Sequence, residues 1–237
     1  MSGVLPLCRL ATQMGGQGNA MPGWVYVVDD DASFRIAVER RLKQSGYEVA
    51  TYASAQELLD RLPNDAVPGC VLLDVRFPGS TGPELQARLR ESDFTMPIIF
   101  LTAYTDIALT VKAVKDGAFD FLTKPVASYE LLSVIERAIA HHATMYNLKG
   151  RLNTVRGQAA ALTPREREVF LLVVTGKRNK QIAVILDCTE RTVKAHRQRV
   201  MEKMQVRTLA ELVSLAERIG LGAAGGQTTQ TISNLRA

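Results

Sequence analysis

From Trp24 to about Ala143, short apolar runs alternate with stretches in which apolar residues recur at helical spacing. Uninterrupted runs of Val, Ile and Leu are typical of strands covered on both faces, and their alternation with helices indicates a doubly wound parallel sheet. Five strands are predicted, at Val25–Val28, Val49–Tyr52, Cys70–Leu73, Ile98–Leu101 and Phe119–Leu122. We therefore expect an α/β domain with a five-stranded parallel sheet.

Helix-start signals fall between these strands. The helices are expected to begin near Phe34, Ser54, Pro83, Asp106 and Ser128. Ser54 and Glu57 have the capping-box spacing, and Ser128 is a candidate N-cap of the fifth helix. The fourth helix is predicted over Asp106–Asp116, because Gly117 follows it as a stop signal.

The C-terminal part of the chain has a different pattern, which is purely helical from Leu162 to Gly220. We predict an all-α domain of four helices over residues 161–221, after an α/β domain over residues 24–144. The polar stretch 145–160 contains two glycines and is predicted to be a linker, with an extension of the fifth helix as the alternative. Residues 1–23 and 222–237 are predicted to be disordered, and Met21 is an alternative start.

The net charge of +5 is located in one part of the chain. Residues 161–220 hold 12 lysines and arginines against 7 acidic residues, whereas the rest of the chain is balanced. Such asymmetry indicates a polyanionic partner for the helical domain alone.

Some classes of protein are disfavoured. Cys8, Cys70 and Cys188 are odd in number and lack metal-ligand spacing, which argues against a disulfide framework or a zinc site. No apolar run approaches the length of a transmembrane helix, and the first residues lack signal-peptide features. A cytoplasmic protein without a membrane partner is expected.

Polar residues follow four of the predicted strands. Asp29 and Asp30 come after the first, Asp74 after the third, Thr102 after the fourth and Lys124 after the fifth. Carboxyl ends of parallel strands gather functional groups, and three clustered carboxylates need a cation such as Mg²⁺. Asp74 is therefore a candidate nucleophile toward a phosphoryl group, whose oxygen charges Mg²⁺, Lys124 and Thr102 would meet.

A helix-turn-helix is predicted in the basic domain, with helices over Asn179–Leu186 and Glu190–Met204. On the second helix an apolar face opposes a basic, amide-bearing face, which suits the edges of bases in the major groove. The apolar face consists of Val193, Val200 and Met204, and the outer face of Arg191, Lys194, Ala195, Gln198 and Glu202. Candidate phosphate contacts are Lys177, Arg178, Lys180, Arg199, Lys203 and Arg207.

Four motifs resemble the receiver domain of bacterial response regulators: VVDDD at 27–31, LLDVRFPG at 72–79, LTA at 101–103 and FLTKP at 121–125. The resemblance implies that Asp74 is the phosphoacceptor. It implies a Mg²⁺ site formed by Asp30 directly, Asp29 through water, Asp74, and the backbone carbonyl of Arg76. Asp31 either supports this site or interacts with a helix dipole.

The same resemblance implies a conformational switch. Thr102 and Phe121 match the family's switch pair, in which a hydroxyl moves toward the phosphoryl group and an aromatic ring turns inward. A strand-end Thr and a core Phe are the structural alternatives for these two residues. The bond between Lys124 and Pro125 matches the family's cis peptide.

LTPREREV at 162–169, NKQIA at 179–183 and ERTVKAHRQRVMEKMQVRTLAELV at 190–213 resemble the LuxR-type DNA-binding domain of the FixJ branch of FixJ/NarL response regulators. By this resemblance Lys194, Ala195 and Gln198 face bases, and Thr192, His196 and Arg199 lie near phosphates. A packed, structural His196 is the alternative. The implied protein is a transcription factor with a sensor histidine kinase and promoter DNA as partners. It would dimerise on phosphorylation, and RNA polymerase is a further candidate partner.

Two other functions compete with this one. A phosphohydrolase of the haloacid-dehalogenase type also uses an aspartyl phosphate, but it needs an acid where this chain has Arg76. A DNA-binding regulator that works without phosphorylation would not need the intact set of Asp29, Asp30, Asp74, Thr102 and Lys124. We therefore expect a regulator whose only chemistry is its own phosphorylation and dephosphorylation.

Overall fold

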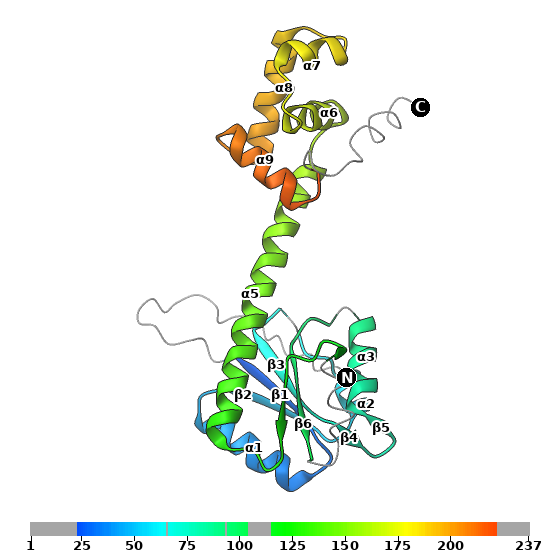
Figure 1. Cartoon of the computed structure of the whole chain (residues 1–237), viewed down its shortest axis with the longest axis vertical. Coiled ribbons are helices and arrows are strands. Elements are labelled where there is room, and N and C mark those ends of the chain that lie inside the picture. Colours follow the sequence, from blue (N-terminus) through cyan, green and yellow to red (C-terminus); the bar gives the residue numbers. More distant parts are fainter. Residues whose placement is uncertain (1–22, 65, 93, 104–114, 222–237) are drawn as a thin grey trace, which may run out of the picture. The chain divides into compact units, whose positions relative to one another are not determined.

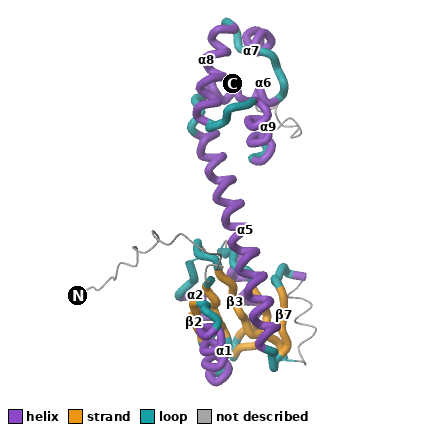
Figure 2. Tube along the Cα trace, turned by 90° about the vertical axis from the view of Figure 1, so that its left-hand side faces the viewer, coloured by secondary structure: helices purple, strands orange, loops and turns teal. Residues whose placement is uncertain are grey.

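The computed structural model describes residues 23–64, 66–92, 94–103 and 115–221 (Figure 1). The chain divides into two compact units, with the boundary between Ala143 and Thr144. In the described residues, the first unit combines strands with helices and the second contains only helices and loops (Figure 2). The predicted combination of an α/β domain and an all-α domain is confirmed.

A five-stranded parallel sheet forms the centre of the first unit, in the order β2-β1-β3-β6-β7. Its strands are β1 (Trp24–Val28), β2 (Glu48–Tyr52), β3 (Gly69–Asp74), β6 (Ile98–Thr102) and β7 (Asp120–Thr123). The strand order reverses direction next to β1, so the carboxyl ends of β1 and β3 flank the point at which ligands bind in such sheets.

Helices cover both faces of this sheet. The described helices are α1 (Ala32–Gln44), α2 (Ala55–Asp60), α3 (Gly82–Glu91) and α5 (Ser128–Ala160). On one face Leu42 of α1 and Ile135 of α5 pack against alternate residues of the strands. On the other face Leu58 of α2 and Leu85 of α3 do the same. The near-continuous apolar strands are explained by this double coverage.

Three local details differ from the sequence predictions. A short antiparallel ladder joins β4 (Arg76–Phe77) to β5 (Ser80–Thr81) directly after β3. Thr81 then caps α3 in a capping box with Glu84. Helix α5 includes Ser128 as its first residue, so Ser128 is not its N-cap. Most of the helix predicted over Asp106–Asp116 lies outside the described residues.

Helix α5 continues without interruption through the stretch 145–160 that we predicted to be a linker, as the alternative interpretation had it. Gly150 and Gly157 disfavour a helix by about 1 kcal/mol each relative to Ala. No proline interrupts the stretch, however, and the last turns of α5 contribute Val155 and Ala159 to the core of the second unit. Packing therefore outweighs the weak local propensity.

The second unit contains four further helices, α6 (Pro164–Val174), α7 (Asn179–Ile185), α8 (Glu190–Lys203) and α9 (Leu209–Arg218). Thr163 caps α6 in a capping box with Glu166, and residues Val169 to Val174 of α6 are all buried. The predicted apolar face of α8 is buried in the same core as α6. It consists of Val193, Val200 and the C-cap Met204. In the described part of the chain, no helix is both long and apolar enough to cross a membrane.

Candidate functional site

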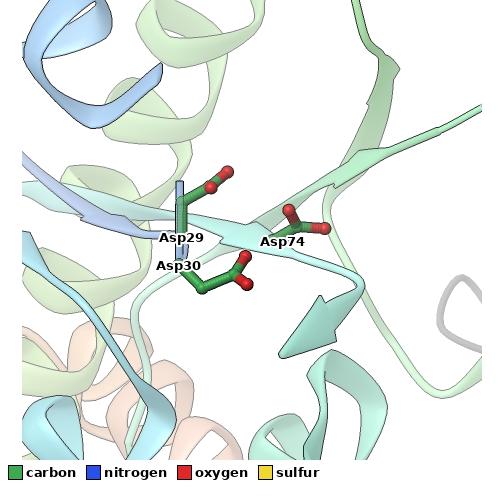
Figure 3. A group of neighbouring side chains, drawn as sticks. All are labelled: Asp29, Asp30 and Asp74. Atoms are coloured by element: carbon green, nitrogen blue, oxygen red, sulfur yellow. The ribbon is translucent and has the colours of Figure 1, made fainter. Parts of the chain in front are cut away.

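Three carboxylates lie at the carboxyl ends of β1 and β3 (Figure 3). Asp29 and Asp30 directly follow β1, and Asp74 is the last residue of β3. One oxygen of each lies within 4.8 Å of an oxygen of the others. An all-oxygen set of this size fits the ligand preference of Mg²⁺, and a bound cation would remove the repulsion between the carboxylates.

Lys124 joins two of these carboxylates. It follows β7, and its Nζ lies 2.5 Å from Oδ2 of Asp29 and 2.5 Å from Oδ2 of Asp74. The backbone N–H of Lys124 donates to the Thr102 carbonyl, and the Lys124–Pro125 peptide is cis. The ammonium also lies 4.3 Å from the centre of the Phe34 ring, a cation–π contact from α1.

Burial and charge determine the ionisation of this cluster. Burial raises the pKa of the Asp29 carboxyl above its usual value, although Lys124 and the N–H of Asp31 oppose that effect. Burial alone would lower the pKa of Lys124, but its hydrogen bonds and charge contacts with Asp29 and Asp74 raise it overall. The ammonium is thus held in its charged form beside Asp74, where it can stabilise negative charge.

The two residues of the predicted switch pair lie in different environments. Thr102, the last residue of β6, is buried, and its hydroxyl donates to the Ala103 carbonyl. Phe121 in β7 is 47% exposed, so the alternative of a core phenylalanine is wrong. The register pairs Leu101 with Asp74 and Thr102 with Thr123, which places the end of β6 beside that of β3 and the end of β7 beside that of β6.

Residues of α1 and its N-cap Asp31 lie around the cluster; Asp31 was predicted with two alternatives, whereas the contacts of Arg35 and Phe34 were not predicted. Arg35 of α1 donates to the backbone carbonyl of Asp29 at 2.5 Å. Asp31 accepts from the N–H groups of Ser33 and Phe34 and so caps α1, which explains this acid without a metal. The ring of Phe34 lies against Lys124 although its spacing indicated only the apolar face of a helix. A local sequence pattern does not predict a contact of this kind, because Phe34 and Lys124 are far apart in the sequence and meet only in the folded domain.

The exposed face of α8 carries the predicted base-reading residues, and α7 adds Lys180 beside it in the helix-turn-helix. The exposed residues among the predicted DNA contacts are Lys177, Arg178, Lys180, Arg191, Thr192, Lys194, Ala195, Gln198, Arg199 and Arg207. Gln198 donates to Glu202 one turn later at 3.0 Å. Thr192 N–H donates to Thr189, the N-cap of α8, so Thr192 lies in the first turn of that helix. The members of this set that belong to α8 lie on its solvent-exposed side, and the others lie on α7 or in the loops next to α7 and α8.

Two basic candidates are less accessible. His196 is half-buried, and its Nδ1 is buried with no hydrogen-bond partner in the described residues, which favours the packed alternative. Lys203 donates to the buried carboxylate of Glu166 at 2.6 Å and to the Ala161 carbonyl at 3.1 Å. This pairing favours a structural role for Lys203 over a phosphate contact.

Comparisons with known proteins agree with both domains. Residues 25–136 match the family model described as the response regulator receiver domain, and residues 160–216 match that of bacterial regulatory proteins of the luxR family. Nodulation protein W of Bradyrhizobium diazoefficiens is 39% identical over 87% of this chain and 90% of its own length. The transcriptional regulatory protein FixJ of the same organism is 39% identical over 84% of this chain and 97% of its own. The solved structure of the response regulator StyR has a TM-score of 0.76 at 40% identity, covering 84% of this chain and all of StyR.

Proposed function

The chain belongs to the FixJ/NarL-type response regulators, and on that basis we propose that it is a transcriptional regulator switched by phosphorylation of Asp74. Its receiver and LuxR-type domains imply a histidine kinase and DNA as partners. The observation that carries the proposal is the Asp74 carboxylate at a strand end, with Asp29, Asp30 and the Lys124 ammonium beside it.

The proposed reaction is transfer from phosphohistidine. An oxygen of Asp74 attacks phosphorus, the P–N bond breaks, and the imidazole nitrogen leaves with the electron pair and takes up a proton. Lys124 neutralises charge that develops on the phosphoryl oxygens. Asp29, Asp30, Asp74 and the Arg76 carbonyl would hold Mg²⁺, which when bound supplies further charge for the same oxygens.

Phosphorylation is proposed to change the surface near β7. Thr102 at the end of β6 is buried, and Phe121 in β7 is 47% exposed. A turn of the exposed Phe121 ring toward the interior would be the second state of the proposed switch. Dimerisation of the phosphorylated receiver would bring two DNA-binding domains together and raise affinity through bivalent binding. Lys194, Ala195 and Gln198 would then read bases, and Lys180, Arg191, Thr192 and Arg199 would approach phosphates.

The decisive experiment compares wild-type protein with Asp74→Asn, with Asp60→Asn as a matched control on the exposed end of α2. Each is treated with Mg²⁺ and acetyl phosphate, and phosphorylation and DNA binding at fixed salt are measured on the same samples. We expect wild type and Asp60→Asn to gain a phosphoryl group and DNA affinity, and Asp74→Asn to gain neither.

The contrary outcomes separate the two halves of the proposal. Equal DNA binding by all three proteins with and without acetyl phosphate would identify a regulator that works without phosphorylation. If wild type is phosphorylated but enriches no sequence from a random pool of DNA, the DNA-binding assignment is refuted.

A further inference from the structure

The ammonium of Lys124 has an uncharged neighbour, the ring of Phe34. A lysine ammonium carries three N–H bonds, and here it donates to Oδ2 of Asp29 and to Oδ2 of Asp74 at 2.5 Å each. The described residues provide no third acceptor, whereas the ammonium lies over the Phe34 ring, 4.3 Å from its centre. The ring is therefore the third group that surrounds this cation.

Hydrogen bonds fix the first turn of α1, which carries Phe34, beside the site. Asp31 accepts from the backbone N–H of Phe34 at 3.2 Å, and Nη1 of Arg35 donates to the Asp29 carbonyl at 2.5 Å. The backbone N–H of Asp31 in turn donates to Oδ1 of Asp29 at 2.9 Å. The ring also packs against the core on this face of the sheet. Its position relative to Asp29 is thus set by the fold.

Partial burial strengthens the attraction between the ring and the ammonium. The Lys124 side chain is 23% exposed, and Phe34 is half-buried. The face of an aromatic ring is negative, and its attraction for a cation increases as water is removed from the pair. An aliphatic side chain would fill much of the same space without that attraction. The aromatic character of Phe34, and not its bulk alone, therefore acts on Lys124.

The proposed phosphoryl transfer changes the partners of Lys124. When an oxygen of Asp74 bonds to phosphorus, the carboxylate becomes an acyl phosphate, and the negative charge then lies on the phosphoryl oxygens. The ring attracts the ammonium without accepting a conventional hydrogen bond, so it leaves the N–H bonds free to turn toward those oxygens. An ammonium that is already in place needs little ordering during the transfer, which favours a faster reaction.

We propose that Phe34 is a positioning residue for the phosphorylation of Asp74, and that it acts by holding the Lys124 ammonium over its ring. This inference rests on the proposed phosphorylation of Asp74 and adds to it a residue outside the acidic cluster. Loss of the attraction by the ring should slow phosphorylation about threefold to tenfold, as the strength of a partly exposed cation–π pair predicts.

Phosphorylation of the full chain by acetyl phosphate with Mg²⁺ tests the proposal. The rate is followed by intact mass for wild type, Phe34→Leu, Phe34→Tyr and a protein with a trifluorinated phenylalanine at position 34. Fluorine withdraws electron density from the ring face and changes its size little, so it weakens the attraction while the packing is kept. We expect Phe34→Tyr to stay within about twofold of wild type, and Phe34→Leu and the trifluorinated protein to be about threefold or more slower.

Phe94→Leu is the matched control, because Phe94 is a half-buried phenylalanine that precedes β6, at the amino ends of the strands. It should leave the rate unchanged. A wild-type rate for the trifluorinated protein would show that the ring only packs, and it would overturn the proposal even if Phe34→Leu failed to fold. So would an equal loss of rate in Phe34→Leu and Phe94→Leu. If wild type itself gains no phosphoryl group, the proposed function is refuted and this inference with it.

Discussion

Glu166 is a charged residue in the interior of the helical domain, and its partners make acid stability predictable. It is 3% exposed, accepts from Lys203 at 2.6 Å and from the Thr163 N–H at 2.9 Å. The hydrogen bond from Lys203 and the backbone bond lower its pKa from 4.5 to about 2. Because the folded pKa lies below the unfolded one, this stabilisation is complete above pH 4.5 and is lost as the pH falls toward 2. The melting temperature of Glu166→Gln should therefore fall less than that of wild type when the pH is lowered from 4.5 toward 2.

The control for this prediction is Glu217→Gln, because Glu217 is an exposed acid of α9. Calorimetry of the full chain from pH 6 to pH 2 compares the two variants with wild type. If the melting temperature of Glu166→Gln falls with decreasing pH as steeply as that of wild type, the ion pair between Glu166 and Lys203 does not control stability in acid.

Gly82 shows a constraint of a purely steric kind. A Cβ at this position would lie 2.6 Å from the Asp74 carbonyl oxygen and 2.6 Å from Cε1 of Phe100. Neither the backbone of β3 nor the fully buried Phe100 ring can move freely. Gly82→Ala should lower the free energy of unfolding by about 1–3 kcal/mol, as overpacked cores do. Urea unfolding measures this change, and an unchanged midpoint would contradict it.

The site residues that lie at the ends of strands could be predicted from the sequence. The contacts between residues that only the folded chain brings together could not. Asp29, Asp30, Asp74 and Lys124 could be grouped because parallel strands align their carboxyl ends. The contact of Phe34 with Lys124 could not be predicted, because it joins α1 to the residue that follows β7. The functional roles of the grouped residues remain predictions that the Asp74→Asn experiment tests.

Among the secondary-structure elements, α5 shows where local propensity misleads. The two glycines and polar residues of 145–160 indicated a linker, yet the helix continues to Ala160. The strands were predicted to within one or two residues because double coverage imposes apolar runs. The ladder between β4 and β5 was missed, since two-residue strands have no periodicity to detect.

Replacing the glycines of α5 should stabilise that helix. Nothing lies within 4 Å of a Cβ placed at Gly150 or Gly157, so Ala would add helix propensity without a clash. Each substitution should contribute about 0.5–1 kcal/mol. Hydrogen exchange of the amides in 144–158 measures the effect locally, and faster exchange in either variant would contradict the expectation.

Gly46 supplies the matched control for these helix glycines. Space for a Cβ is equally open there, but its φ of +88° is strained for an L-residue. Gly46→Ala should therefore destabilise the first unit by roughly 1–2 kcal/mol. The opposite signs at Gly46 and Gly150 would show that backbone conformation, not available space, decides the result.

At the scale of the whole molecule, charge is divided between the domains. The helical domain carries an excess of five positive charges, equal to the net charge of the chain. Several of these cations, among them Lys180, Arg191, Lys194 and Arg199, are exposed on α7 and α8. A surface of this kind suits phosphate contacts, which make DNA affinity fall steeply with salt.

The salt dependence of DNA binding can separate contact from net charge. If Lys180 and Arg199 each neutralise one phosphate, Lys180→Gln and Arg199→Gln should each reduce the slope of log K against log salt by about 0.9. Arg40→Gln removes the same charge from the exposed face of α1 in the receiver domain, where no DNA contact is expected. Its slope should match that of wild type. An equal reduction for all three variants would mean that the overall charge of the protein, and not the helix-turn-helix surface, drives association with DNA.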